Sequence, residues 1–355
     1  MLDNVDTIRS VDPGNMYNRI FDFPEQVAEA FKLAEGWKVN PTDFAGVKNI
    51  VLIGMGGSAI GGDLVRTYLG ARLQVPMVIC RHYALPEFVD DETLVIASSY
   101  SGNTEETMSA LDDALGRKAM LVALTTGGMM AEVCKLNDIP MLTLPAGLQP
   151  RAALGYSMIP LLVLFDRIGL VKGLVKEIPQ TIKEMQMRRE VYIEDTPTEK
   201  NLAKAVAARL HGRIPIIYGG PVLTDVVAVR WKGQMCENGK NMAFANQFPE
   251  FNHNELVGYC DVLKPHKDHL VVVMIRTGDD HPKVTKRIDI VKGIIEKSGV
   301  PVVDVWGMGT TPLSRLLSLV QLGDFVSYYL AILNNVDPTP VAAIETLKKA
   351  LAEGN

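Results

Sequence analysis

The sequence has 355 residues, a length that suits two domains of ordinary size. Hydrophobic residues make up 47% of it and charged residues 22%, as in a globular protein with well-filled cores. The net charge of −5 excludes a protein that attracts nucleic acid through a basic surface, so partners must be inferred from local sites.

Targeting and redox signals favour a reduced, soluble, cytoplasmic protein. The beginning of the chain has no basic segment followed by an apolar core, so we expect no signal peptide. No apolar run reaches the roughly 20 residues that a membrane-spanning helix needs, so no membrane association is expected. The cysteines are far apart and form no CxxC pair or metal-ligand cluster, so we expect no metal: Cys80, Cys134, Cys236 and Cys260.

The first half of the chain has the pattern of a parallel α/β domain. Residues 1–45 read as a helical segment, with helical apolar spacing from Tyr17 to Trp37. Short apolar runs then alternate with helix-like spacing, which predicts βαβ units and a sheet covered on both faces. The predicted strands are Asn49–Ile53, Val75–Cys80, Thr93–Ala97, Met120–Thr125 and Ile139–Leu144, and the predicted helices are Thr104–Leu115, Met129–Leu136 and Ala152–Ile168.

The second half repeats this pattern after a charged stretch at 173–200, which we interpret as exposed helix and linker. We therefore predict an α/β protein of two related, doubly wound parallel-sheet domains. Its parts are an N-terminal helical segment (1–45), a first domain (46–172), the linker and a second domain (201–355). In the second domain we predict strands at Ile214–Tyr218, Leu270–Ile275 and Pro301–Trp306, a helix at Val284–Lys297 and a terminal helix over 344–351.

A glycine-rich turn, Gly54–Asp63, follows the first predicted strand and opens a helix. Glycines allow a sharp turn, and the helix N-terminus favours an anion, although a tight turn with Ser58 as N-cap is the structural alternative. The spacing Gly54-x-Gly56-x-x-Ala59 also permits a dinucleotide site. That reading requires an acidic residue at the end of the second strand, where the sequence has Arg81, so we do not favour it.

A hydroxyl-rich loop, Ser98–Thr104, lies at the next predicted strand-to-helix junction. Asn103 and Glu106 fit a capping pair for the helix that follows. Capping uses one or two polar side chains, whereas this loop carries five hydroxyls, which together with backbone amides form a neutral cradle for a phosphate. No Gly-x-x-x-x-Gly-Lys-Ser/Thr loop for a nucleoside triphosphate is present.

These two motifs, Gly-Gly-Ser at 56–58 and Ser-x-Ser-Gly-Asn-Thr at 99–104, resemble the sugar isomerase (SIS) domain family. More narrowly, the chain resembles the bifunctional phosphoglucose/phosphomannose isomerases of archaea and bacteria. The resemblance covers most of the chain. It continues through Pro150–Tyr156, Cys236–Lys240, Phe251–Glu255 and Asp337–Pro340.

The resemblance implies an aldose–ketose isomerase that interconverts glucose 6-phosphate, and mannose 6-phosphate, with fructose 6-phosphate through a cis-enediol. It implies no cofactor and no metal. The hexose 6-phosphate would be held by residues of the two loops. The implied binding residues are Gly57, Ser58, Ser99, Ser101 and Thr104.

Such a reaction needs a base that reaches C1 and C2, an acid/base group for ring opening and a cation beside the enediolate. The resemblance assigns proton transfer to Glu237 and ring opening to His253, which in the family reaches the partner's site and so implies a homodimer. It assigns Arg151 to the C1–C2 oxygens, where a planar cation is suited to an enediolate. Lys348, on the terminal helix, resembles the lysine that assists at the ring oxygen.

Tolerance of both C2 epimers is associated in the family with a threonine near the C-terminus. Thr339 is our candidate, and Thr346, which lies near Lys348 on the predicted terminal helix, stays open as the alternative.

Two other functions remain as hypotheses. A non-catalytic sugar-phosphate sensor would need the hydroxyl cradle but neither Glu237 nor His253, and it often carries a DNA-binding helix-turn-helix. The 48 residues before the first predicted strand lack the basic character for one. An amidotransferase-type isomerase would need a glutaminase domain, which is absent from this sequence.

Overall fold

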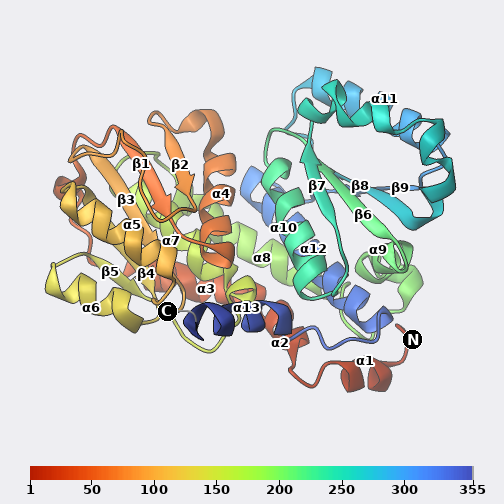
Figure 1. The fold of residues 1–355 in the computed structure, drawn as a ribbon, viewed down its shortest axis with the longest axis horizontal. Helices are drawn as coiled ribbons and strands as arrows, with labels where there is room; N and C mark the ends of the chain where they lie inside the picture. Colours follow the sequence, from red (N-terminus) through yellow and green to blue (C-terminus); the bar gives the residue numbers. More distant parts are fainter. Residues whose placement is uncertain (354–355) are drawn as a thin grey trace. The chain divides into compact units, whose positions relative to one another are not determined.

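The computed structural model describes residues 1–353, which form two compact units (Figure 1). The five-stranded unit consists of Asp22–Gln186 and Gly309–Ser314. The four-stranded unit consists of Met1–Phe21, Met187–Met308 and the chain from Arg315 onward. Both units are parallel α/β structures, which confirms the predicted fold class. The N-terminal segment is divided between them, so the two units are not simple halves of the sequence.

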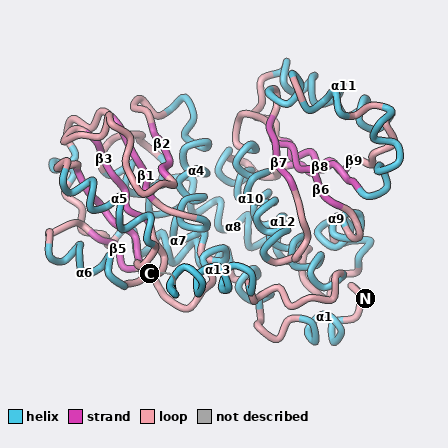
Figure 2. The backbone as a smooth tube through the Cα atoms, in the orientation of Figure 1, coloured by secondary structure: helices cyan, strands magenta, loops and turns pink. Residues whose placement is uncertain are grey.

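The five-stranded unit has its sheet in the order β2-β1-β3-β4-β5. Strands β1 and β3 are almost wholly buried because helices cover the sheet, which explains their unbroken apolar runs in the sequence (Figure 2). One face packs on α5 and α6, while α3, α7 and α4 pack on one another in succession. The strands are β1 Asn49–Ile53, β2 Met77–Cys80, β3 Thr93–Ser98, β4 Met120–Thr125 and β5 Met141–Thr143, and the helices are α3 Phe23–Glu35, α4 Gly56–Leu69, α5 Glu105–Gly116, α6 Gly128–Leu136 and α7 Leu154–Arg167.

The four-stranded unit has its sheet in the order β7-β6-β8-β9, again parallel throughout. Its core joins strands β6, β8 and β9 to α11 and to a cluster of aromatic rings, in which Tyr218 stacks on Phe251 at 4.0 Å. The strands are β6 Ile214–Gly219, β7 Phe244–Gln247, β8 Leu270–Arg276 and β9 Val302–Trp306, and the helices are α1 Val5–Val11, α2 Met16–Phe21, α9 Leu202–Leu210, α10 Thr224–Glu237, α11 Pro282–Lys297 and α13 Ala342–Glu353.

Two helices run across the division between the units, α8 (Ile178–Arg189) and α12 (Pro312–Leu333). Helix α12 is long and apolar enough to cross a membrane by length and mean composition, although Arg315, Gln321 and Asp324 interrupt it and it is not an unbroken apolar run. In the structure 94% of that apolar window is buried, as in the core helix of a folded domain. A helix that is buried on nearly all sides shows no clear amphipathic period, which explains why the sequence pattern did not identify it.

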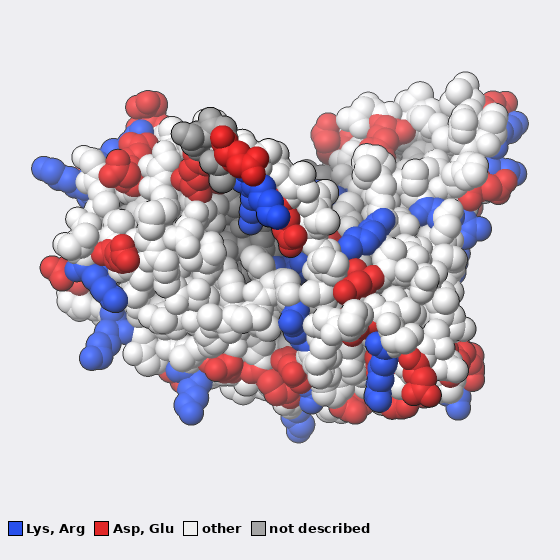
Figure 3. All heavy atoms as spheres, turned by 60° about the horizontal axis from the view of Figure 1, so that its bottom comes forward, with Lys and Arg blue, Asp and Glu red and all other residues white. Residues whose placement is uncertain are grey.

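The surface shows no separation of charge on the face that Figure 3 draws, where Lys and Arg are interspersed with Asp and Glu. This mixture is consistent with the modest net charge of −5.

Candidate functional site

The first glycine turn joins β1 to α4 and lies directly against the loop that carries Arg151. A Cβ atom added to Gly57 would lie 2.4 Å from the carbonyl oxygen of Pro150 and 3.1 Å from the backbone nitrogen of Arg151. Only glycine permits this approach, because no real side chain fits at such distances. The structure therefore brings Arg151, which is only 5% exposed, to the turn that contains Ser58.

Ser58 links the glycine turn to the hydroxyl-rich loop. Its Oγ accepts a hydrogen bond from the backbone N–H of Tyr100 at 3.1 Å, and its carbonyl accepts one from the Ser98 hydroxyl at 3.2 Å. Helix α4 begins at Gly56 with Met55 as its N-cap, so the alternative that Ser58 caps this helix was wrong. The buried Ser58 instead lies in the first turn and joins the two predicted phosphate loops.

The remaining hydroxyls of the loop gather at the start of α5. The Oγ of Ser99 lies 2.9 Å from Oγ1 of Thr104 and accepts the backbone N–H of Gly102 at 3.1 Å. The Oγ of Ser101 accepts the N–H of Asn103 at 3.3 Å, and the Ser101 side chain is exposed. Three of the four residues whose hydroxyls we assigned to phosphate binding thus belong to one compact loop at a helix N-terminus.

The capping role expected of Asn103 was wrong. Helix α5 begins at Glu105 with Thr104 in the N-cap position, and no side-chain capping bond is made there. The Oδ1 of Asn103 instead accepts the backbone N–H of Met129 at 3.0 Å, in the first turn of α6. The side chain thus satisfies a free N–H of a neighbouring helix, a partner that is not visible from local spacing.

Two of the hydroxyls in this loop serve the fold. The hydroxyl of Tyr100 donates to the carbonyl of Pro145 at 2.7 Å and accepts the N–H of Leu148 at 3.2 Å, which anchors the segment leading to Arg151. Ser98 is buried, and its hydroxyl bonds Ser58 as described above.

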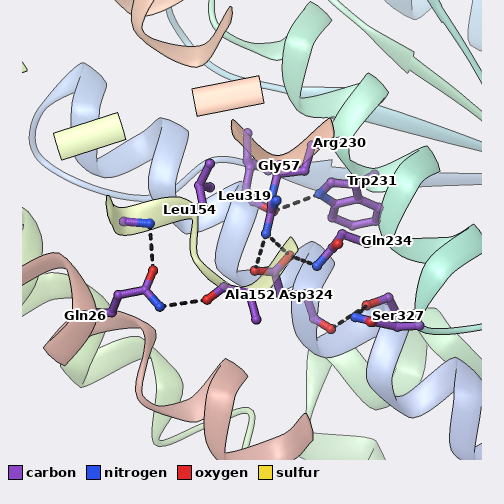
Figure 4. A network of polar contacts seen from close by, with 12 residues as sticks. Gln26, Gly57, Ala152, Leu154, Arg230, Trp231, Gln234, Leu319, Asp324 and Ser327 are labelled. Carbon is purple, nitrogen blue, oxygen red and sulfur yellow. Dashed lines mark hydrogen bonds and ion pairs between the residues drawn. The ribbon is translucent and has the colours of Figure 1, made fainter. Parts of the chain in front are cut away.

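Gln26 of α3 holds the segment after Arg151 from the other side, a contact that the sequence analysis missed. Its Nε2 donates to the carbonyl of Ala152 at 2.7 Å, and its Oε1 accepts the N–H of Gly155 at 2.7 Å (Figure 4). A Cβ atom on Gly155 would lie 2.8 Å from that Oε1. The backbone around Arg151 is therefore held by the glycine turn and by Gln26, which restricts where the guanidinium can lie.

In the four-stranded unit, Glu237 is the last residue of α10. Helix α10 is fastened to α12 by buried polar contacts (Figure 4). Asp324 accepts two hydrogen bonds from the same guanidinium nitrogen of Arg230, at 2.8 and 2.9 Å, and Trp231 donates to the carbonyl of Leu319 at 2.8 Å. These contacts fix the helix that carries the candidate base.

Glu237 lines a cavity of about 430 Å³ together with Cys236, Lys240 and the chain from Pro340 to Ile344. The Nζ of Lys240 donates to the carbonyl of Glu237 and, at 3.2 Å, to that of Pro338. Lys240 thereby ties the end of α10 to the segment that leads into α13. The structure thus unites two motifs, Cys236–Lys240 and Asp337–Pro340, which lie about 100 residues apart in the sequence.

The two candidate threonines have different surroundings. Thr339 precedes the cavity wall, and its side chain packs on Gly14, where an added Cβ would lie 2.2 Å from the Thr339 Oγ1. Thr346 is exposed on α13, and its hydroxyl bonds the carbonyl of Ala342 within the same helix at 2.9 Å. Lys348 is also exposed on α13, the helix whose first residues line the cavity.

His253 is exposed at the end of a short 3₁₀ helix, Glu250–His253. It is not among the described residues that line the Glu237 cavity. The neighbouring Glu255 accepts hydrogen bonds from Tyr218 and from Nδ2 of Asn246, the latter at 2.6 Å, which secures the segment after His253 to the sheet. Within residues 1–353, no group of three or more His, Cys, Asp and Glu is arranged to hold a metal ion.

Known proteins resemble the chain along nearly its whole length. Residues 199–351 match the family described as bacterial phospho-glucose isomerase C-terminal SIS domain. A bifunctional phosphoglucose/phosphomannose isomerase of Caldicellulosiruptor bescii is 44% identical over 338 residues, which cover 95% of this chain and 99% of that protein. One of Aquifex aeolicus is 36% identical over 330 residues, which cover 91% of this chain and 98% of that protein.

A solved structure of a hypothetical protein from Thermus thermophilus shares the fold, with a TM-score of 0.75 at 17% identity, and the match covers 98% of this chain and 93% of that one. The sequence matches carry the relationship further than the fold does, because they show 36–44% identity over more than nine-tenths of this chain. The chain belongs to the family of bifunctional phosphoglucose/phosphomannose isomerases.

Proposed function

We propose that this protein interconverts glucose 6-phosphate and mannose 6-phosphate with fructose 6-phosphate. The observation that carries the proposal is the position of Glu237, a carboxylate at the end of a firmly held helix and on the wall of a cavity. A sensor that only binds a sugar phosphate has no need for a carboxylate placed in this way. The relatives, which are named as isomerases, do not favour the sensor alternative.

The hydroxyl loop and the first turn of α4 are proposed to bind the phosphate group. Backbone N–H groups and neutral hydroxyls hold a monophosphate without a permanent charge, which suits a group that is positioned but does not react. Ser58 links the two loops, so it also sets their mutual geometry. The proposed ligands are Gly57, Ser58, Ser99, Ser101 and Thr104.

Glu237 is proposed to transfer the proton. Its carboxylate removes the proton on C2 of the open-chain aldose, the C1 carbonyl becomes a hydroxyl, and a cis-enediol forms. The same proton is returned to C1, and the C2 hydroxyl releases its proton to become the ketone carbonyl, which balances the proton that the C1 oxygen took up. C1 is reduced and C2 is oxidised, so no electrons are gained or lost overall. Glucose 6-phosphate and mannose 6-phosphate differ only at C2, so both give the same enediol, and one base serves both reactions.

The other candidates are proposed to act around this step. The nearly buried Arg151 stabilises negative charge on the C1–C2 oxygens, because a cation held in place needs little reorganisation. Lys348 assists at the ring oxygen, and His253 acts as the acid/base group for ring opening. Thr339 is preferred to Thr346 for epimer tolerance, because it adjoins the cavity wall and the hydroxyl of Thr346 is bonded within α13.

We further propose a cytoplasmic homodimer in which each chain supplies His253 to its partner's site. Two features support this: His253 is exposed, and it precedes a segment with exposed apolar side chains. Val257 is 77% exposed and Val262 is 82% exposed. Such side chains are expected where another protein surface covers them.

Purified protein treated with EDTA should convert each hexose 6-phosphate, as measured by the formation of fructose 6-phosphate. Glu237→Gln should lower kcat by at least about a thousandfold while leaving sugar-phosphate binding nearly unchanged, because it removes the base without changing its size. Glu296→Gln, on the exposed face of α11, is the matched control and should be fully active. Equal loss of binding and turnover in Glu237→Gln would make this glutamate structural and refute its assigned role.

A further inference from the structure

The four-stranded unit has its own glycine turn between a strand and a helix. Strand β6 ends at Gly219, Gly220 follows, and α10 begins at Thr224. A Cβ atom on Gly219 would lie 2.0 Å from the carbonyl oxygen of Thr224. This turn is therefore as tightly packed as the first glycine turn, in which a Cβ atom on Gly57 would lie 2.4 Å from a backbone oxygen. The two turns occupy equivalent places in the two sheets.

Strand register shows which loops correspond. In the five-stranded unit Ile53 pairs with Ala97, and in the four-stranded unit Gly219 pairs with Ile275. The loop after β8 is therefore the counterpart of the hydroxyl-rich loop after β3. The correspondence extends to one side chain, since Ser99 and Thr277 each lie two residues beyond these paired positions and both are buried.

Each of these hydroxyls accepts a backbone N–H from the loop that follows it. Ser99 Oγ accepts from Gly102, and Thr277 Oγ1 accepts from Asp279 at 3.2 Å. Beyond this shared feature the loops differ in charge. The first loop continues with Ser101, Asn103 and Thr104, whereas the second continues with Asp279 and Asp280.

The carboxylate of Asp280 lies in the second glycine turn. A Cβ atom on Gly220 would lie 2.5 Å from its Oδ2 and 2.6 Å from its Oδ1, and the N–H of Val222 donates to Oδ1 at 3.4 Å. Asp280 is only 7% exposed, and its Oδ2 has no hydrogen-bond partner among the residues that the structure describes. An anionic group thus points into a strand-to-helix turn, as a phosphate does in other proteins.

Neighbouring charges do not explain this placement. Burial raises the pKa of Asp280 to about 6, and Asp279 and Asp225 face it with like charge. Arg276 is the cation nearby, but it also bonds Asp289 at 2.6 Å. Asp279 is itself held by Arg315, whose Nε lies 2.7 Å from its Oδ2. Among the groups that favour the charged form of Asp280, the backbone N–H of Val222 contributes more than Arg276 does, and the N-terminus of the 14-residue helix α10 adds to it.

We propose that the second glycine turn is an anion cradle that Asp280 keeps closed, so that the four-stranded unit binds no phosphate of its own. Asp280 is the built-in ligand of this turn. Replacing the carboxylate side chain of Asp280 by a smaller one uncovers a site for a phosphate monoester or for inorganic phosphate. The N–H of Val222 and the hydroxyl of Thr277 are then available to this ligand.

The test counts phosphate sites in the full-length chain by isothermal titration with inorganic phosphate near pH 7.5. Asp280→Ser opens the turn and should add one phosphate per chain to the number bound by the unchanged protein. Asp280→Asn, which keeps the turn filled without a charge, should add none. Asp280→Ala is a second opening variant, and circular dichroism confirms that each variant is folded.

The added site should also be localised. Thr277→Val combined with Asp280→Ser should weaken the extra site at least about fivefold, because one hydroxyl ligand is lost, and should leave the original site unchanged. No added phosphate in either opening variant would overturn the proposal, and so would an added phosphate in Asp280→Asn. The result is independent of isomerase activity, so failure of the proposed function would be seen separately.

Discussion

The buried Asp280 predicts how the stability of this protein changes with pH. Its pKa is raised from 3.8 to about 6, chiefly by burial. Below pH 3.8 the carboxyl group is protonated in both the folded and the unfolded chain. As the pH rises towards 6, the unfolded chain releases its proton first, so the free energy of unfolding falls. A difference of about two pKa units corresponds to about 3 kcal/mol, and above pH 6 the loss is complete.

Asp280→Asn removes this titration while keeping the shape of the side chain. The free energy of unfolding is measured by urea denaturation at pH 4 and at pH 7.5 for both proteins. From pH 4 to pH 7.5, the stability of Asp280→Asn relative to the unchanged protein should increase by about 2–3 kcal/mol. Asp268→Asn, at an exposed position, is the control and should show no such gain. A constant difference between Asp280→Asn and the unchanged protein across this range would refute the reasoning, because it would show that Asp280 titrates alike in both states.

Two further predictions concern close contacts of glycines. Gly57→Ala should lower kcat/KM at least about tenfold in hexose 6-phosphate assays, because its Cβ would lie 2.4 Å from the backbone that carries Arg151. Gly14→Ala should change the ratio of kcat/KM for the mannose and glucose epimers by about threefold or more, because its Cβ would displace Thr339. Gly116→Ala, where nothing lies within 4 Å of the added Cβ, should change neither quantity. An unchanged epimer ratio in a folded Gly14→Ala variant would argue against a specificity role for Thr339.

The strands of the five-stranded unit were the most predictable elements. Strands β1 and β4 begin and end at the predicted residues, because a parallel sheet covered on both faces has continuous apolar runs. Strand β7, Phe244–Gln247, was missed because it is a partly exposed edge strand with two amide side chains. The stretch from Tyr17 to Trp37, whose spacing predicted helix, contains two helices, α2 and α3, which are separated at Asp22; Pro24 stands in the first turn of α3.

The candidate site divides in the same way into local and distant features. Both loops that we propose to bind phosphate could be located from sequence, because glycines and hydroxyls at a strand-to-helix junction form a local pattern. Roles that depend on distant partners were not recognisable. Asn103 was expected to cap its own helix and caps the next one, and the clamp made by Gln26 joins residues 126 positions apart. No local pattern records such contacts.

The sequence alone determined the fold class, the two loops and the family resemblance, because each depends on residues that are close together along the chain. Only the tertiary structure showed that Gly57 packs on the Arg151 loop and that Glu237 lines a cavity beside the start of α13. It also revealed a carboxylate in the second glycine turn. Asp280 lies 60 residues beyond Gly220, and the pairing of β6 with β8 is what brings them together. Contacts of this kind arise when strands pair and helices pack, so they can be seen only in the folded chain.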